Sequence, residues 1–342
     1  MTRLERIISR GASRFFLWWH RRELAEPPPF PRRINIETTS ICNLDCLMCP
    51  TRSKMRADGT MPMELFRRAA DEIAEYGAEI VWLHAWGEPL VDAHLFERIA
   101  YIKQYPSIRN VVISTNATLL RGERARQLAE SALDTVVFSL DGVTAETYEA
   151  IRRGARFSAV LENVRRFLEA RQAGGGKGPR AVFQIIAMRE TAHEIEAFRA
   201  YWQPFLQPGD FIHVKSFNTW AGKTEDRGLP ERGIDFRVPC TAFLWDALTI
   251  LWNGDVVPCC FDVDGELVIG RFGEQTLAQI WQGPALAELR RRHCRLDFQR
   301  VPLCAACQHT HARLNGERVW NFLRARLGRP ADAAAQEGRP AF

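Results

Sequence analysis

The sequence lacks a hydrophobic run long enough to cross a bilayer, and it has no secretory signal at its start. The apolar block Phe15–Trp19 is too short for either role, and basic residues follow it closely. We therefore predict a cytoplasmic protein in which thiols stay reduced. Segment 1–31 is expected to form a basic, aromatic helix that packs on the domain and ends at Pro27–Pro29. A helix lying on a membrane surface is the less favoured alternative.

A strong charge of one sign is also missing. Lysine and arginine number 46 against 41 aspartate and glutamate residues, which gives a formal charge of +5 at pH 7. Because this excess is small and scattered, it indicates a solvated surface rather than a nucleic-acid site. No internal repeat is present. The 342 residues, 46% of them hydrophobic, suffice for one large domain or for a large domain with a small one.

From about residue 32 to residue 218, short β-prone runs alternate with stretches of helical periodicity. The expected strands are 34–39, 80–86, 111–116, 135–141, 181–188 and 211–217, and the expected helices are 62–76, 94–104, 121–131, 155–172 and 190–203. This alternation is typical of βα units on a parallel sheet. Six strands are too few for a closed eight-stranded barrel, so an open partial barrel and a doubly wound sheet both fit. In either fold the active site is expected at the carboxyl ends of the strands.

The pattern changes after residue 218. Residues 219–235 are polar and rich in glycine, as expected of a linker. The stretch "ALTILWNGDVVPCCF" (247–261) predicts a β-hairpin with Asn253 and Gly254 in a type I′ turn, and a helical stretch follows at 276–292. We therefore expect a small hairpin-plus-helix domain over 236–315, and a disordered tail over 328–342.

Seven of the nine cysteines fall into two groups, which in a reducing compartment indicate metal rather than disulfides. The first group, Cys42, Cys46 and Cys49, has the spacing C-x3-C-x2-C just beyond the first expected strand. A structural zinc site usually closes with four ligands, and no fourth Cys or His is near. Three thiolates on a 4Fe–4S cluster leave one iron without a protein ligand, and that iron is able to bind a substrate or cofactor.

This arrangement closely resembles the radical S-adenosylmethionine (SAM) superfamily, in which the methionine group of SAM chelates the open iron. Other segments lie where that family places its SAM contacts: "WGEP" (86–89), "STN" (114–116), "SLDG" (139–142) and "AIRRG" (150–154). With this resemblance we predict an α/β fold, a partial (β/α)6 barrel over 32–218. It implies a SAM-binding set of Met48, Trp86, Gly87, Glu88, Pro89, Ser114, Asn116, Ser139, Asp141 and Arg153, with Arg152 as the alternative arginine.

Two positions depart from the family pattern. Trp86 replaces the first Gly of the family's Gly-Gly-Glu-Pro segment, and Met48 stands where an aromatic residue often precedes the third cysteine. Both are expected near adenine or substrate. Taken singly, Glu88 fits a helix cap equally well, and Asn116 and Asp141 fit turns; the joint occurrence at successive strand ends favours the SAM interpretation.

The second cysteine group is Cys240, Cys259, Cys304 and Cys307, and the hairpin is expected to fold Cys259 back toward Cys240. A structural zinc site is a competing interpretation of these four residues. The C-terminal part, however, resembles the SPASM extension or its shortened form, Twitch, which carries auxiliary 4Fe–4S clusters. No cysteine follows Cys307, so the resemblance implies the shortened form with one auxiliary cluster held by four protein ligands. The whole resemblance covers residues 32 to 315.

The resemblance also implies a mechanism. A reduced cluster at the first cysteine group passes an electron to SAM, and the resulting 5′-deoxyadenosyl radical removes a hydrogen atom from the substrate. The expected outcome is oxidation or epimerisation of a small polyol, aminosugar or aminocyclitol, with a flavodoxin- or ferredoxin-type electron donor. Modification of a ribosomally made peptide is the alternative; about thirty residues precede the first strand, too few for a leader-peptide-binding domain. A non-catalytic zinc-binding protein is the alternative of another class.

Candidates for catalytic side chains are few. Cys260 and Cys294 are candidate hydrogen-atom donors, although a buried or incidental thiol is the favoured interpretation of each. Lys215 and His213 share one face of the sixth strand, and Gln184 lies on the fifth. We expect Lys215 to be the pocket residue among them.

Overall fold

The computed structural model describes residues 2–230 and 233–314, and its main element is one sheet with the strand order β10-β9-β8-β1-β2-β3-β4-β5-β6. All neighbours from β8 to β6 pair in parallel, whereas β9 and β10 pair antiparallel at one edge. The strands are β1 (Arg33–Ile36), β2 (Ala78–Trp82), β3 (Ile108–Thr115), β4 (Thr135–Ser139), β5 (Arg180–Ala187), β6 (Phe211–Ser216), β8 (Ala247–Ile250), β9 (Asp255–Val257) and β10 (Gly270–Arg271).

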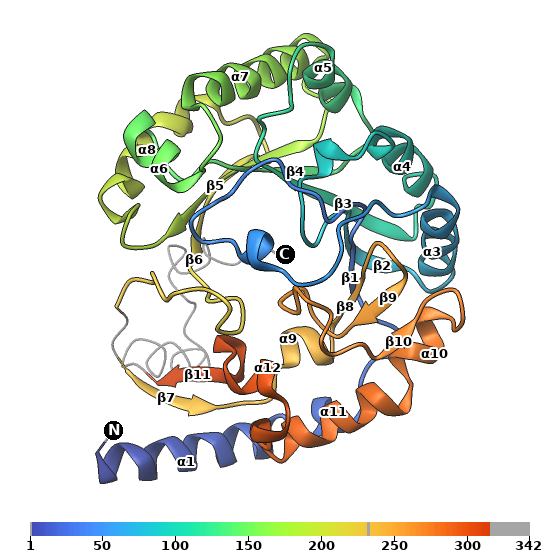
Figure 1. Ribbon diagram of the computed structural model, residues 1–342, viewed down its shortest axis with the longest axis vertical. Coiled ribbons are helices and arrows are strands. Elements are labelled where there is room, and N and C mark those ends of the chain that lie inside the picture. The colour runs from blue at the N-terminus through green and yellow to red at the C-terminus, as the bar shows by residue number, and fades with distance from the viewer. Residues whose placement is uncertain (1, 231–232, 315–342) are drawn as a thin grey trace.

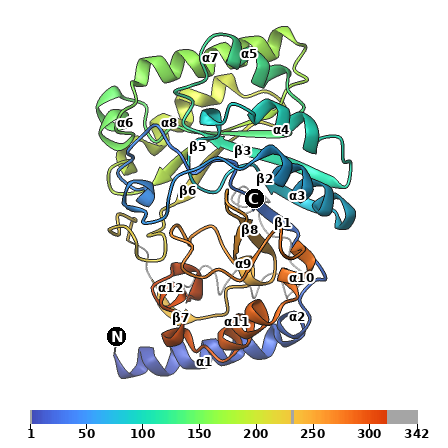
Figure 2. The same cartoon turned by 45° about the vertical axis from the view of Figure 1, so that its right-hand side comes forward.

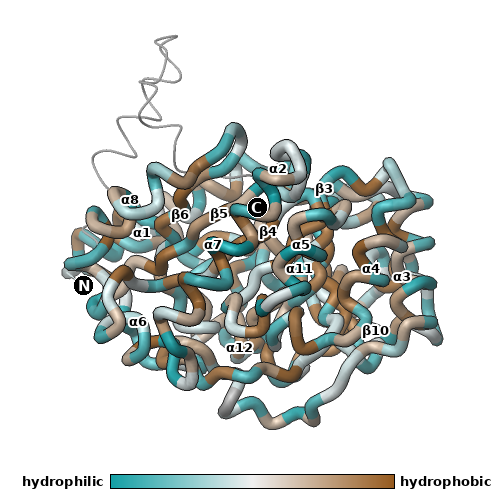
Figure 3. Tube along the Cα trace, turned by 90° about the horizontal axis from the view of Figure 1, so that it is seen from above, coloured by the Kyte–Doolittle hydropathy of each residue, from teal (hydrophilic) through white to brown (hydrophobic). Residues whose placement is uncertain are grey.

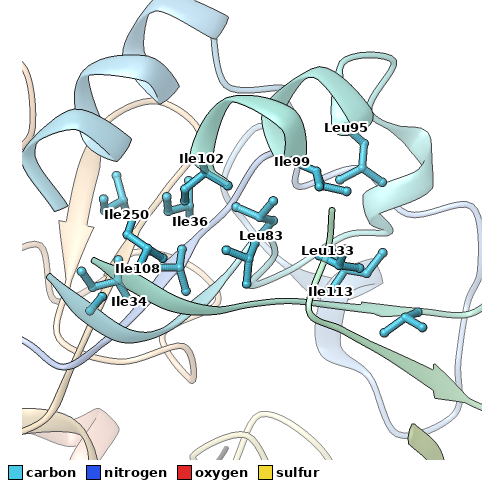
Figure 4. Packing of buried hydrophobic residues seen from close by; sticks show 14 of the residues in the cluster. Ile34, Ile36, Leu83, Leu95, Ile99, Ile102, Ile108, Ile113, Leu133 and Ile250 are labelled. Atoms are coloured by element: carbon cyan, nitrogen blue, oxygen red, sulfur yellow. The ribbon is translucent and has the colours of Figure 1, made fainter. Parts of the chain in front are cut away.

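Helices cover the outer side of this curved sheet (Figure 1). They are α3 (Met63–Tyr76), α4 (Leu95–Ile102), α5 (Glu123–Glu130), α6 (Ala145–Ile151), α7 (Phe157–Ala173) and α8 (Ile195–Trp202). In α3 the buried residues Phe66, Ala69, Ala70 and Ile73 recur at helical spacing, so one apolar face meets the sheet. Figure 4 shows the resulting layer, in which isoleucine and leucine side chains of strands and helices interlock. Apolar segments gather inside the molecule and polar ones at its periphery (Figure 3).

The predicted partial barrel is therefore confirmed: the sheet is open, with β6 and β10 at its two edges in the part of the chain described. Every strand predicted between residues 34 and 217 is present. The sequence did not predict α6, a short helix between β4 and α7. The helical stretch at 276–292 is divided into α10 (Leu277–Trp281) and α11 (Pro284–Cys294), because Pro284 begins a new helix.

The C-terminal part extends the barrel sheet. Strand β8 pairs in parallel with β1, with Ile36 opposite Ile250, so the first strand of the predicted hairpin lies in the same sheet as the βα units. The hairpin itself is confirmed by the antiparallel pairing of β8 and β9. The predicted type I′ turn is wrong: Gly254 has φ +90° but Asn253 does not have a positive φ, and the Gly254 N–H donates to the Leu251 carbonyl at 2.9 Å. This geometry fits a turn of ordinary hand followed by a left-handed glycine.

The N-terminal segment forms two helices where one was predicted, α1 (Arg3–Trp19) and α2 (Arg21–Ala25), and α2 ends before the proline run. Helix α1 lies along the outer rim beside β7 (Ile234–Arg237), which pairs with β11 (His311–Leu314) (Figures 1 and 2). Two indole N–H groups tie the segment down: Trp245 donates to the Leu24 carbonyl at 3.1 Å and Trp281 to the Pro28 carbonyl at 2.7 Å. No helix among the residues described is long and apolar enough to cross a membrane. The tail predicted over 328–342 lies outside the described residues.

Candidate active site

The first cysteine group lies on a loop that crosses the carboxyl ends of the strands, in the centre of Figure 1. Two backbone hydrogen bonds hold this loop against the C-terminal end of α6 and the residues that follow it, from Asp45 N to Arg153 O at 3.1 Å and from Leu47 N to Ile151 O at 2.9 Å. Cys46 is buried, whereas Cys42 and Cys49 are half-buried. The residues on either side of Cys46 are thus held by the protein backbone.

The three thiols influence one another. Burial first, and then the nearby Glu88, Cys46 and Cys49, raise the pKa of Cys42 to about 12. Burial also raises the pKa of Cys46, while Arg152 opposes this effect. Thiols that share one partly buried space and repel one another as thiolates are a suitable donor set for a cationic iron centre. The first cysteine group therefore fits a cluster.

Gly87 allows the segment after β2 to touch the chain that leads into the cysteine loop. Its φ is +89°, and a Cβ atom placed there would lie 2.5 Å from the Thr39 carbonyl oxygen and 2.8 Å from that of Ile41. The next residue, Glu88, donates its backbone N–H to Ile41 O at 2.9 Å. Only glycine fits this close approach.

The carboxylate of Glu88 is used within the protein. It accepts hydrogen bonds from Thr115 Oγ1 at 2.5 Å, Asn116 N at 2.8 Å and Leu90 N at 3.1 Å. It therefore joins the end of β2 to the end of β3 and caps the short 3-10 helix Pro89–Val91. Glu88 therefore acts as the helix cap that the sequence also allowed.

Polar residues after β3 and β4 join the same network. The side-chain amide of Asn116 donates to Asn43 Oδ1 at 3.0 Å, which ties the "STN" segment to the cysteine loop. The hydroxyls of Ser114 and Ser139 lie 3.0 Å apart, on neighbouring strands. The segment after β3 is thus tied to the cysteine loop, and the hydroxyls at the ends of β3 and β4 meet each other.

A buried ion pair stands beside the cysteines. Asp141, fully buried and with φ +40°, accepts from Arg152 Nε at 2.8 Å and from the Ile186 N–H at 2.6 Å. Arg152 Nη1 donates to Cys46 Sγ at 3.6 Å. The arginine expected here, Arg153, is exposed, and its neighbour Arg152 points inward instead. A helical segment that ends at Ile151 turns only one of the two adjacent arginines toward the strands.

Both departures from the family pattern contact one residue, Trp220. The rings of Trp86 and Trp220 have centroids 4.7 Å apart, and Trp220 Nε1 donates to the Met48 carbonyl at 2.9 Å. Trp220 in turn meets Phe261 of the small domain at 5.2 Å. Trp220 was not predicted as a site residue, because it lies in a polar stretch interpreted as a linker. Its positive φ of +51° shows that the chain is held there in an uncommon conformation.

Lys215, on β6, faces the interior between the strand ends and the small domain. Burial lowers its pKa, and the negative charges of Cys260 and Asp141 oppose that effect. Burial and then the Lys215 charge lower the pKa of His84 to about 3 and that of His213 to about 4. His84, which the sequence analysis did not single out, accepts a hydrogen bond from the Ser114 N–H at 3.2 Å.

The second cysteine group surrounds a cavity in the small domain. The cavity is lined by Cys240, Cys259, Cys304 and Cys307 together with His293, Phe243, Phe261 and Leu303. Burial raises the pKa of each of the four thiols, to about 12 for Cys304. Among the residues described, no three His, Cys, Asp or Glu side chains are close enough together to hold a single metal ion. The cavity is small, about 20 Å³, and apolar, and the four thiols on its wall are the number that a cluster held entirely by protein requires.

The two remaining cysteines lie in different places. Cys260 adjoins the second group but does not line its cavity, and the Lys215 charge acts on its thiol. Cys294 lines a separate cavity between α11 and the proline run Pro27–Pro29. The structure therefore brings Cys260 toward Lys215 and leaves Cys294 elsewhere.

Comparison with known families agrees with this geometry. The family description "Radical SAM superfamily" matches residues 36–201, and SPASM, an "iron-sulfur cluster-binding domain", matches residues 240–308. The second match begins at Cys240 and ends just after Cys307, so it contains the whole second cysteine group.

Several characterised relatives share part of the sequence. The tungsten-containing aldehyde ferredoxin oxidoreductase cofactor-modifying protein of Pyrococcus furiosus is 24% identical over 285 residues, 72% of this chain and 79% of the relative. The GTP 3′,8-cyclase of Syntrophomonas wolfei is 31% identical over 234 residues, 65% of this chain and 68% of the relative. The chain spans less than half, 42%, of the GTP 3′,8-cyclase of Clostridium perfringens strain SM101, at 30% identity over 40% of this chain.

Solved structures share the fold at low identity. BtrN in complex with AdoMet and 2-DOIA superposes with a TM-score of 0.58 at 17% identity, over 83% of this chain and 94% of BtrN. Streptococcus suis SuiB bound to precursor peptide SuiA gives 0.62 at 16% identity, over 81% of this chain and 70% of SuiB. Together with the motifs and the two family matches, these likenesses show that the chain belongs to the radical SAM superfamily, carries a C-terminal SPASM-type domain and uses 4Fe–4S clusters and SAM as cofactors.

Proposed function

We propose that this radical SAM enzyme acts on a small polyol, aminosugar or aminocyclitol, and that it either oxidises the substrate or inverts one of its carbons. The observation that carries the proposal is the position of Lys215. Its charge acts on His84 after β2, on Asp141 after β4, and on Cys260 and His309 in the small domain. A substrate bound against Lys215 would therefore lie between the two cysteine groups.

The cofactor sites follow from the donor sets. Cys42, Cys46 and Cys49 would hold the cluster that binds SAM, and the four thiols of the second group would hold one auxiliary cluster. When bound, these groups supply one-electron chemistry that removes a hydrogen atom from an unactivated C–H bond. A small electron-transfer protein of the flavodoxin or ferredoxin type is the proposed electron donor.

The chain's own residues prepare the site for that chemistry. Arg152 directs a guanidinium toward Cys46, where it balances negative charge on the thiolates, and Asp141 fixes its orientation from the other side. Gly87 and Glu88 hold the segment after β2 against the cysteine loop. Trp86 and Trp220 pack against each other beside Met48 of the cysteine loop.

Lys215 is the proposed proton acceptor in an oxidation. Because burial lowers the pKa of Lys215, its Nζ releases a proton more readily than that of an exposed lysine. A neutral Nζ facing the substrate is able to take the proton that leaves during oxidation, while the electron would pass to the auxiliary cluster held by the second cysteine group. In an inversion, the Cys260 thiol is the candidate that gives a hydrogen atom to the substrate radical, and the electron that, with a proton, restores the thiol would come from the auxiliary cluster. Lys215 then only orients the substrate.

The share of each solved structure that superposes on this chain favours a small substrate over a peptide. The superposition covers 94% of BtrN, whose solved complex contains 2-DOIA, and 70% of SuiB, whose solved complex contains a precursor peptide. The fit to SuiB keeps a peptide substrate as the second candidate.

The test is anaerobic reconstitution, followed by iron analysis and reduction in the presence of SAM. We expect about eight irons per chain, as two 4Fe–4S clusters require, and formation of 5′-deoxyadenosine. Zinc without SAM cleavage would favour the non-catalytic alternative. With aminocyclitol and aminosugar panels, a product lighter by two hydrogens indicates oxidation, and uptake of solvent deuterium on carbon indicates inversion. Turnover of precursor peptides but of no small polyol would overturn the proposed substrate class.

A further inference from the structure

Helix α1 turns its apolar face away from the protein. Leu4, Ile7, Phe15 and Trp18 are 65%, 61%, 50% and 57% exposed, although their spacing places them on one side of the helix. Ile8 and Trp19 widen the same face, at 37% and 39% exposed. A surface helix ordinarily buries such a face in the core of its own domain. In α1 the apolar face runs the full length of the helix and is exposed to solvent, as far as the described part of the chain shows.

The side of α1 that meets the protein is the less apolar one. Ser13 is buried there, with its hydroxyl donating to the Ser9 carbonyl at 3.1 Å, and Phe16 and Leu17 are half-buried. The helix begins with a capping box in which Thr2 and Glu5 satisfy each other's backbone N–H groups. It is therefore a well-formed helix that contacts the protein by one side, while most of its hydrophobic side is exposed within the ranges 2–230 and 233–314.

A row of arginines borders the apolar face. Arg3, Arg6, Arg10 and Arg14 recur every three or four residues, so they share one flank of the helix, and all four are exposed. No ion pair is formed by these four arginines within the described ranges 2–230 and 233–314. At the far end, Arg21 lies over the Trp18 ring at 5.2 Å. The helix thus combines an apolar strip with unpaired positive charge beside it.

The position of α1 suits contact with a flat surface. It lies along one outer edge of the molecule, with the small domain between it and the strand ends (Figures 1 and 2). A partner on the exposed side of α1 would therefore not cover the candidate active site. Helices with an apolar strip of Leu, Phe and Trp and a basic flank lie in the interface of anionic bilayers, where tryptophan rings sit at the level of the headgroups.

We propose that α1 binds the surface of an anionic membrane, with its apolar strip inserted at the headgroup boundary and its arginine row on the lipid phosphates. The charge pattern favours this occupant over a second copy of the chain, since two copies would bring their arginine rows together. The site is independent of the proposed reaction, and the expected membrane contact is peripheral and reversible.

The test uses the full-length, cluster-loaded protein and co-sedimentation with vesicles. Vesicles of phosphatidylcholine with phosphatidylglycerol should bind the protein, and vesicles of phosphatidylcholine alone should bind it weakly. Two charge reversals, Arg6→Glu with Arg10→Glu, should weaken binding to anionic vesicles at least about tenfold, and higher salt should do the same. Ile7→Ser with Trp18→Ser should weaken it comparably through loss of apolar insertion.

Matched controls separate this surface from general electrostatics. Arg109→Glu with Lys177→Glu makes the same change in net charge at exposed positions outside α1 and should leave vesicle binding within about twofold of the parent. All variants change exposed side chains, so iron content and thermal unfolding should match the parent protein. The proposal is overturned if the full chain does not bind anionic vesicles, or if the control pair weakens binding as much as the α1 pairs. Concentration-dependent dimers that Ile7→Ser and Trp18→Ser abolish, without vesicle binding, would assign the face to self-association instead.

Discussion

Arg152 links Asp141 to Cys46: its Nε donates to the Asp141 carboxylate at 2.8 Å and its Nη1 to the Cys46 sulfur at 3.6 Å. The carboxylate is fully buried and also accepts the Ile186 N–H at 2.6 Å, so its position is fixed from two sides. A guanidinium is suited to this role because its planar fork serves two acceptors at once, which an ammonium group does with less directional control.

Replacing Arg152 should therefore affect both stability and cofactor chemistry. Arg152→Met leaves the buried Asp141 without its partner, which costs about 3–5 kcal/mol of unfolding free energy. We expect a lower Tm and at least a tenfold loss of 5′-deoxyadenosine formation, measured on protein reconstituted with iron. The matched control is Arg153→Met, which changes an exposed neighbour and should stay within about 0.5 kcal/mol of the parent. Equal effects of the two variants would contradict the assignment of Arg152.

A glycine pair tests the close contact behind the cysteine loop. Gly87→Ala should lower the iron content of the first cluster and abolish SAM cleavage, since the added Cβ would lie 2.5 Å from the Thr39 carbonyl oxygen. Gly122 also has a positive φ, +53°, but nothing lies within 4 Å of the position of its Cβ. Gly122→Ala therefore reports backbone strain alone, expected to cost about 1–2 kcal/mol. If both variants kept full iron and activity, the contact at Gly87 would not be needed.

The sequence allowed the barrel strands to be predicted because period-two β-prone runs and helical periodicity are local properties of the chain. The pairing of β8 with β1 could not be predicted in the same way, since it joins residues more than two hundred positions apart, Ile36 and Ile250. The turn at Gly254 was predicted with the wrong hand because Asn-Gly is compatible with more than one hairpin turn.

The part of the candidate site that consists of short sequence motifs could be predicted. Cysteine spacing singled out both thiol groups, and the strand-end motifs singled out Gly87, Glu88 and Asp141, whose assignment as SAM contacts stays a prediction. Trp220 and His84 were not predicted, because nothing local distinguishes a site tryptophan in a polar stretch, or a half-buried histidine just after a strand, from an ordinary one. The choice between Arg152 and Arg153 depends on the helical phase of α6, a helix that the sequence pattern did not reveal.

The iron content per chain tests the assignment of an auxiliary cluster to the second cysteine group. Cys304→Ala with Cys307→Ala should lower the iron content from about eight to about four per chain, because two of the four thiols that line the cavity are removed. SAM cleavage should persist, since the first cysteine group is intact, while product formation should fall. Cys294→Ala is the control, because its thiol lines a separate cavity beside Pro27–Pro29, and it should retain the full iron content. A double variant that still held about eight irons would contradict the assignment of a cluster to this cavity.

Lys215 gives a prediction in pH. Because burial lowers its pKa, the folded protein releases this proton at a lower pH than the unfolded chain, whose lysines titrate near about 10.4. Between those two values the unfolded chain binds more protons, so Lys215 makes the free energy of unfolding rise with pH in that window.

If Nζ accepts the substrate proton, the yield of product per 5′-deoxyadenosine should also rise with pH through the lowered pKa. Lys215→Arg should remove that rise and lose product at least about tenfold, because arginine stays protonated, while 5′-deoxyadenosine still forms. Product yield in Lys215→Arg that matched the parent at every pH would show that Lys215 only orients the substrate, and an inversion with Cys260 as hydrogen donor would then be the better account.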